Sequence, residues 1–95
     1  MTGSSHLWQT PRDADLRHRE WDGEHVFFHG AAGDTHRLSA AAAVVLLELM
    51  AGPCDEIRLA EALSKEDMGS QKEAEVALPE ILRELARIEC AERAS

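Results

Sequence analysis

Residues 21–50 read WDGEHVFFHGAAGDTHRLSAAAAVVLLELM, and this stretch decides the fold. Asp22-Gly23 is typical of a two-residue hairpin turn, because a type I′ turn needs positive φ at both central positions. We therefore expect two antiparallel strands on either side of this turn, over residues 15–21 and 24–29.

A second, looser turn follows the hairpin. Gly30 and Gly33-Asp34 supply its turn residues, and residues 35–38 then form a third short strand. In the strand before this turn, alternate side chains point to opposite faces of the sheet. One face receives Val26 and Phe28, and the other receives His25, Phe27 and His29. Aromatic side chains on both faces indicate a sheet that is covered on one side and partly used on the other.

The period of the apolar residues changes from two to 3.6 after residue 38, which predicts a helix over residues 40–50. Ser39 is placed to cap its first turn, and Gly52-Pro53 is a strong stop signal. The helix is apolar nearly all round, so we expect it to be the buried centre of the fold. Its large side chains are those of Val44, Val45, Leu46, Leu47, Leu49 and Met50.

A second helix is expected over about residues 55–64, capped by Cys54 or Asp55. Its inner side is expected to carry Ile57, Leu59 or Ala60, and Leu63. The polar residues 65–69 predict a loop after it.

The last helix, over about residues 71–89, begins with a capping box, because Ser70 and Glu73 have the required spacing. Pro79 lies inside its apolar pattern, where it cannot donate to the helix ladder. The helix either kinks at Pro79, which we favour, or is divided, with a short helix ending near Val76 and a longer one starting at Pro79.

Three strands followed by three helices predict an α+β domain with a winged-helix-like layout. Ninety-five residues are enough for one domain whose core needs neither a disulfide nor a metal. We expect this domain to span residues 1–95, with residues 1–7 disordered and the ring of Trp8 packed against the sheet.

Composition excludes several classes of protein. Ten basic and eighteen acidic side chains give a net charge of −8, which disfavours nonspecific binding to phosphate backbones. No run reaches the eighteen or so apolar residues of a membrane span, and the N-terminus lacks a signal-peptide pattern. The isolated Cys54 and Cys90 favour two reduced thiols over a single disulfide. We therefore expect a cytoplasmic protein that binds neither membrane nor nucleic acid.

The residue patterns give little support for chemistry within the chain. His25, His29 and His36 lie close together in the predicted sheet, but no cysteine accompanies them, so they favour packing or hydrogen bonds over a metal site. His36 and Ser39 resemble a nucleophile–base pair only weakly, because Ser39 is needed as the helix cap. The sequence holds no phosphate loop, dinucleotide fingerprint or paired-carboxylate motif. We expect no catalytic residue, no metal and no cofactor.

Part of this sequence resembles the PqqD-like family of small peptide-binding domains, which serve in the modification of ribosomal peptides. The similarity is to the branch associated with a kinase related to the HPr kinase. That branch shows W-D-G-x-x-V-x-[FY], then G-D-T-H-x-L, then an alanine-rich apolar helix. Here the pattern stands as Trp21-Asp22-Gly23, Val26-Phe27-Phe28 and Gly33–Ser39. The resemblance covers roughly residues 8–90, and its distinctive positions lie within Trp21–Leu47.

The resemblance implies a noncatalytic chaperone, similar to a RiPP recognition element, that captures a precursor (leader) peptide and presents it to a separate kinase-related or radical enzyme. It implies that the peptide adds to the third strand and rests against the last helix. The implied contacts are Thr35, His36, Arg37 and Leu38 on the strand, and Leu78, Ile81, Leu82 and Leu85 on the helix. A Leu/Ile stripe is more often core than groove, so both interpretations of the helix residues stay open. The family's usual ending, a glycine followed by apolar residues, is replaced by Glu89-Cys90-Ala91, so the helix cap is expected to differ.

Two other functions stay open. The winged-helix-like layout also fits a small DNA-binding or transcription-factor-like domain, although the last helix interleaves its basic residues with glutamates. A structural subunit without a peptide ligand is the third choice. We expect a monomer or a weak homodimer.

Overall fold

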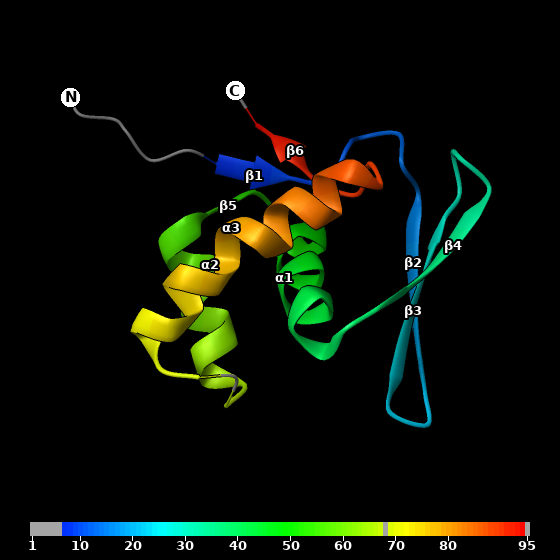
Figure 1. The fold of residues 1–95 in the computed structure, drawn as a ribbon. Coiled ribbons are helices and arrows are strands. Elements are labelled where there is room, and N and C mark those ends of the chain that lie inside the picture. Colours follow the sequence, from blue (N-terminus) through cyan, green and yellow to red (C-terminus); the bar gives the residue numbers. More distant parts are fainter. Residues whose placement is uncertain (1–6, 68, 95) are drawn as a thin grey trace.

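The architecture comes from a computed structural model that describes residues 7–67 and 69–94. Two small antiparallel sheets and three helices make up this part of the chain (Figure 1). In chain order they are β1 (Leu7–Gln9), β2 (Leu16–Trp21), β3 (Glu24–His29), β4 (Asp34–Leu38), α1 (Ala40–Ala51), β5 (Cys54–Asp55), α2 (Glu56–Lys65), α3 (Gln71–Arg87) and β6 (Glu92–Arg93). The predicted α+β, winged-helix-like fold is confirmed.

The larger sheet has the order β2-β3-β4, with each neighbouring pair antiparallel. Asp22 and Gly23 close its first hairpin with φ angles of 58° and 79°, as a type I′ turn requires. The two faces divide as predicted, because Phe27 is fully buried whereas Phe28 is 41% exposed. All three helices lie on the Phe27 side of the sheet (Figure 1), so the Phe28 side has no helix over it in the described part of the chain.

The core lies between the three helices and the inner face of this sheet. Its largest fully buried side chains are Phe27, Val45, Leu46, Leu49, Leu59, Leu63, Leu78, Leu82, Leu85 and Cys90. Within residues 7–67 and 69–94, no helix has the length and apolar character needed to cross a membrane.

Helix α1 begins and ends at the predicted caps, but it is not buried all round. The Ser39 hydroxyl accepts a hydrogen bond from the Ala42 N–H at 3.2 Å, and Gly52 follows the last turn. Leu46 is fully buried, whereas Leu47 is 37% exposed. The helix thus supplies the centre of the core, as predicted, although one of its faces is exposed. The sheet, α2 and α3 pack against the other sides of α1 and leave Ala40, Val44 and Leu47 uncovered or half-covered.

Helix α2 is capped by Asp55, whose carboxylate accepts a hydrogen bond from the Arg58 N–H at 2.8 Å. Leu59, Ala60 and Leu63 form its buried side. The prediction that Ile57 also faces inward is wrong, because this side chain is 63% exposed. Ile57 lies about 200° around the helix from Leu59 at roughly 100° per residue, which turns it away from the core.

Helix α3 begins with the predicted capping box between Ser70 and Glu73. It continues without a break through Pro79, so the alternative of two separate helices is wrong. Burial of its apolar stripe stabilises the helix, and this stabilisation outweighs the loss of the one backbone hydrogen bond that Pro79 cannot donate.

The end of α3 is a Schellman motif with glutamate in the place usually taken by glycine. Glu89 has a φ of 63°. The Glu89 N–H donates to the Ala86 carbonyl at 3.0 Å, and the Cys90 N–H donates to the Leu85 carbonyl at 2.9 Å. The cap thus differs from the family pattern in its residue, while the hydrogen bonds of a glycine cap are retained.

A second sheet, of order β5-β1-β6, was not predicted. Trp8 pairs with Cys54 in β5 and with Arg93 in β6, so its backbone belongs to this sheet, and its side chain packs at the edge of the core. The Trp8 Nε1–H donates to Glu56 Oε2 at 3.2 Å, and the Arg93 guanidinium lies 5.6 Å from the ring centre. Leu7, expected to be disordered, lies in β1 because its backbone is paired there. The same expectation for residues 1–6 falls outside the described residues.

The two cysteines are buried free thiols. Burial raises the pKa of the Cys90 thiol to about 11. Burial and the nearby Glu48 carboxylate also raise the pKa of Cys54. Both thiols therefore stay protonated at neutral pH, which makes them poor nucleophiles and poor metal ligands.

Candidate peptide-binding site

β4 is an edge strand of the larger sheet, since β3 is its only paired neighbour in the described residues. An unpaired edge carries backbone N–H and C=O groups that a further strand can bind. The pairing register shows which residues of β4 supply those groups.

The register is set by the first hairpin. Trp21 and Glu24 flank a two-residue turn, so they form a hydrogen-bonded pair. Hydrogen-bonded and non-hydrogen-bonded pairs alternate along an antiparallel ladder. β3 therefore directs the backbone groups of residues 24, 26 and 28 toward β2. The groups of residues 25, 27 and 29 are directed toward β4.

The same alternation decides the outward groups of β4. The β4 partners of residues 25, 27 and 29 are Leu38, His36 and Asp34, and these three face β3. Thr35 and Arg37 therefore direct their N–H and C=O groups away from the sheet. They form the hydrogen-bonding part of the free edge.

The side chains of β4 also divide between two faces. His36 and Leu38 lie on the inner face and are partly buried, and Leu38 packs against the core. Thr35 and Arg37 are exposed on the outer face. The Arg37 Nε lies 3.3 Å from Glu24 Oε1, and both side chains are more than half exposed.

The predicted residues of α3 have a different placement. Leu78, Leu82 and Leu85 are 1%, 1% and 0% exposed and belong to the core. Ile81 is partly buried and packs at the edge of the core. Of the four, Ile81 is thus the side chain with surface to offer a ligand, and the leucines anchor the helix beneath it.

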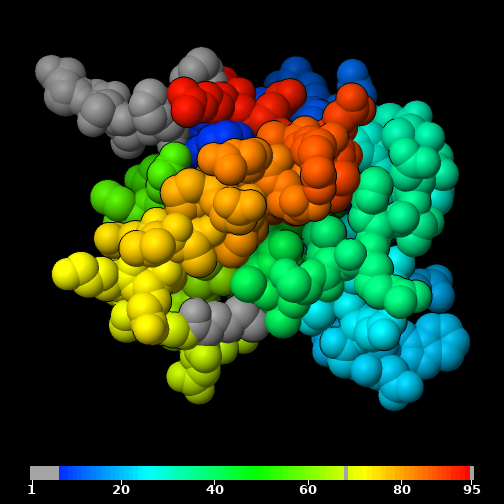
Figure 2. Space-filling model, in the orientation of Figure 1, coloured from blue at the N-terminus to red at the C-terminus, as the bar shows by residue number. Residues whose placement is uncertain are grey.

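Parts of β4 and of α3 are visible on one face of the molecule (Figure 2). Figure 1 shows α3 in front of α1, with the β2-β3-β4 sheet to the right of both helices. In Figure 2 the C-terminal half of α3, the start of α1 and the region of β4 all contribute to one visible face.

Three of the four histidines of the larger sheet, His18, His25 and His29, have hydrogen-bond partners. Ala32 N–H donates to His29 Nδ1 at 3.2 Å, and His29 Nε2 lies 3.0 Å from the Glu89 carbonyl oxygen. His25 Nδ1 lies 3.1 Å from His18 Nε2, with the two rings stacked. In the part of the chain that the structure describes, no three His, Cys, Asp or Glu side chains are grouped as metal ligands.

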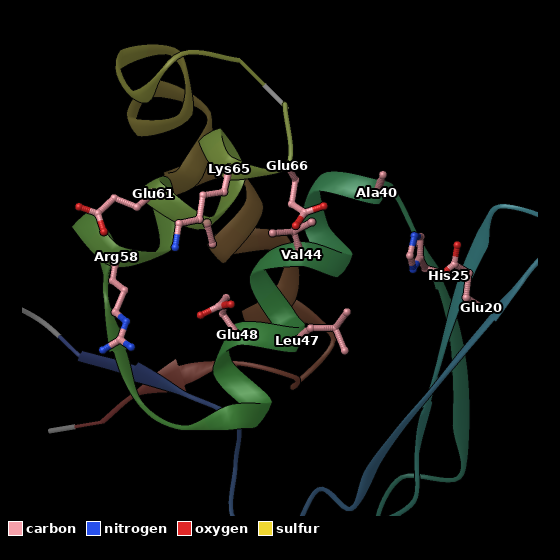
Figure 3. A pocket seen from close by; sticks show the side chains of 11 residues that line it. Glu20, His25, Ala40, Val44, Leu47, Glu48, Arg58, Glu61, Lys65 and Glu66 are labelled. Carbon is pink, nitrogen blue, oxygen red and sulfur yellow. The ribbon is translucent and has the colours of Figure 1, made fainter.

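A cleft of about 600 Å³ separates α1 and α2 from the β2–β3 hairpin. Figure 3 shows Val44, Leu47 and Glu48 of α1 between the α2 side chains and the strands that carry Glu20 and His25. The whole lining consists of Glu20, His25, Ala40, Val44, Leu47, Glu48, Arg58, Glu61, Ala62, Lys65 and Glu66. These residues include neither serine, threonine nor cysteine, so the lining offers charge and apolar surface without a hydroxyl or thiol nucleophile.

The basic outer face of the sheet was missed from the sequence. Arg19, Val26 and Arg37 lie directly across from one another on β2, β3 and β4. The neighbouring row holds Arg17, Phe28 and Thr35. The signal was present in the alternation of arginines along LRHREW, but only the register between strands places them in rows.

Comparison with known proteins adds one structural relative. No protein-family model matches this sequence, and no curated protein matches it. A solved structure described as lasso peptide synthetase B1 complexed with the leader peptide superposes with a TM-score of 0.65. The superposition covers 90% of this chain and 96% of that chain, at 19% identity. The two chains share a fold.

Proposed function

We propose that this chain is a noncatalytic peptide chaperone of the PqqD-like kind, a RiPP recognition element. It captures a precursor (leader) peptide as an added strand on β4 and presents it to a separate modifying enzyme, kinase-related or radical, in the cytoplasm. The observation that carries the proposal is the open edge at which Thr35 and Arg37 direct their backbone groups outward. The shared fold of a protein solved with a leader peptide supports it.

The number of free backbone groups at the edge determines how much binding free energy the side chains must contribute. Two outward residues offer two N–H and two C=O groups, and each hydrogen bond contributes roughly 0.5–1.5 kcal/mol net. Backbone pairing therefore supplies roughly 2–6 kcal/mol, whereas micromolar affinity needs about 8 kcal/mol. The remainder comes from contacts of the peptide with side chains beside the edge. Leu38, His36 and Ile81 are the partly buried apolar and aromatic groups available.

Delivery needs no chemistry in this chain. A chaperone that binds a peptide and an enzyme together raises the effective concentration of the peptide at the active site, by up to millimolar amounts for short flexible connections. The chaperone acts as a monomer or a weak homodimer. The enzyme carries the cofactors and catalytic groups.

Backbone N-methylation of the bound peptide tests strand addition directly. Where a short precursor is encoded beside this gene, its synthetic leader peptide is the probe, with one N-methyl group at each position in turn. Methylation removes one N–H, so we expect affinity to fall at alternate residues over a short stretch and to be retained between them. Titration of ¹⁵N-labelled protein should shift the amide signals of residues 34–38 and α3 together. Losses without a two-residue period, or shifts confined to α2, would contradict the proposal.

Substitutions at Arg37 provide a matched pair on the protein side. Arg37→Pro removes an outward N–H without removing a β3–β4 hydrogen bond, so peptide binding should weaken at least fivefold more than in Arg37→Ala. Arg37→Ala removes the same side chain and keeps the N–H, and it serves as the control. Chemical shifts of both free proteins establish that the sheet is intact. Equal affinities of the two variants would show that the edge is not used.

A further inference from the structure

The outer face of the larger sheet is unusually basic for a chain with a net charge of −8. Arg17, Arg19 and Arg37 all project from this face, where no helix of the described chain lies. Arg17 and Arg37 make exposed ion pairs with Asp15 and Glu24 at 3.6 and 3.3 Å. Exposed pairs of this kind contribute little and exchange easily, so the arginines remain available to a stronger carboxylate partner.

Strand addition would extend the rows of this face by one residue. The row that runs Arg19, Val26, Arg37 ends at the free edge of β4. A peptide strand bound there places one side chain directly beside Arg37, on the outer face and about 5 Å away. The flanking peptide residues point to the inner face, because side chains alternate along a strand.

The inner face has the opposite character. The flanking residues would lie beside His36 and Leu38, which are partly buried next to Phe27 and the core. Apolar side chains gain most from this position, because they exclude water from a surface that is already half covered. One side of the peptide therefore meets an arginine, and the other meets the edge of an apolar core.

We propose that the β4 edge selects extended peptides in which an acidic residue lies beside Arg37 and apolar residues flank it on both sides. This inference rests on the proposed function and names the class of peptide that the same site takes. The guanidinium presents five N–H donors, enough to contact a peptide carboxylate while Glu24 remains nearby. Arg19, in the same row, adds positive potential without reaching the peptide.

The negative charge of the rest of the molecule would by itself disfavour an acidic residue in the bound peptide. The exposed side of α3 carries Glu73, Glu75, Glu80 and Glu84, which favour a basic peptide at longer range. Such contacts are screened within about 8–10 Å at ordinary salt. The residue adjacent to Arg37 is closer than that, so the arginine decides the charge at this one position.

Selection from a random library tests the proposal without a known ligand. Twelve-residue random peptides displayed on phage are selected against the wild-type protein, Arg37→Gln and Arg19→Gln. The control Arg19→Gln removes an equal charge from the same row, but it lies three strand spacings from the peptide, roughly 14 Å. Amide spectra of all three free proteins verify that the sheet is unchanged.

We expect the wild-type and Arg19→Gln selections to yield Asp or Glu flanked by apolar residues, and the Arg37→Gln selection to yield the apolar positions without the acid. In a selected synthetic peptide, Glu→Gln should weaken binding to the wild type by up to about fivefold and leave binding to Arg37→Gln unchanged. If peptides are selected whose binding is lost in Arg37→Pro but which show no preference for acid, the inference fails and the proposed function stands. If no peptide is selected whose binding depends on the edge, both fail.

Discussion

A single buried histidine joins the larger sheet to the end of α3. His29 is 4% exposed, and its Nδ1 accepts a hydrogen bond from Ala32 N–H. The ring proton therefore lies on Nε2, which donates to the Glu89 carbonyl oxygen. That carbonyl belongs to the residue with positive φ that ends the helix. This histidine, for which the sequence favoured packing or hydrogen bonds over a metal site, thus serves to hold a helix end against a strand.

Replacing His29 tests this role. His29→Ala removes the donor of a partly buried hydrogen bond to the Glu89 carbonyl, and we expect a loss of roughly 1–3 kcal/mol in the free energy of unfolding. His36→Ala removes the same side chain from a half-buried position of β4 and should cost less. Urea unfolding followed by circular dichroism measures both. Equal losses in the two variants would contradict a special role for His29.

The Cys90 thiol gives the chain a pH dependence in the alkaline range. Its pKa is about 11 in the folded protein, against an ordinary value of 9.0, because burial disfavours the thiolate. The folded state therefore keeps its proton when the unfolded state has lost it. The contribution of Cys90 to stability should be constant below about pH 9 and should fall between pH 9 and 11. The chain contains no tyrosine, which leaves few other groups that titrate there.

Urea midpoints measured at pH 8, 9, 10 and 11 test this dependence. Cys90→Ala provides the control, because it removes the titrating group from the same buried site. The decline should be shallower in the variant than in the wild type. A parallel decline in both proteins would assign the effect to other groups.

Among the elements, α1 shows most clearly that neighbouring residues can have opposite roles. Leu46 is fully buried at the centre of the core, whereas Leu47 is 37% exposed beside the cleft. Leu46→Ala should cost roughly 2–5 kcal/mol, because a large aliphatic side chain leaves a cavity. Leu47→Ala, with the same chemical change on the next residue, should cost under about 1 kcal/mol. Similar losses, measured by urea unfolding, would mean that the helix is buried on both sides.

The sequence predicted those elements whose ends have a local chemical signal. Asp22-Gly23, Ser39 and the pair Ser70/Glu73 each fix a turn or a cap through their own backbone and side chain, so neighbours in the chain suffice. β1, β5 and β6 have two or three residues each, too few to show a period. They exist because distant segments meet, which no local pattern records.

The candidate site was predictable to a similar depth. The position of β4 could be predicted from the turn before it. Identifying Thr35 and Arg37 as the residues whose backbone groups point outward required the pairing register from β2 through β3. The stripe of Leu78, Leu82 and Leu85 has the same spacing in a core as in a groove. Only the packing of α1 and α2 against it shows that these leucines are buried.

At the scale of the whole molecule, the winged-helix-like fold is compatible with DNA binding, but the net charge of −8 is not. The exposed side of α3 is rich in glutamate, and Arg83 and Arg87 are paired with Glu80 and Glu84. We expect binding to random duplex DNA to be no tighter than about 10⁻⁴ M at physiological salt. Fluorescence anisotropy with a labelled 20-base-pair duplex measures it, with serum albumin as an acidic control. Micromolar, salt-sensitive affinity would instead favour the transcription-factor alternative.

The small sheet also affects how this fold can be attached to other proteins. β1 and β6 come from opposite ends of the chain and pair side by side, and Figure 1 shows them together, away from the open edge of β4. A second protein joined at Leu7 or at Ala94 would start from nearly the same point, because the Ala94 N–H donates to the Leu7 carbonyl at 2.8 Å. A fusion partner can therefore be attached before β1 or after β6 with a similar geometry. A circular permutant that joins β6 to β1 by a short loop, with new termini in another loop, would retain the strand pairings of both sheets. In each arrangement the attachment points lie in the β5-β1-β6 sheet, which does not include β4.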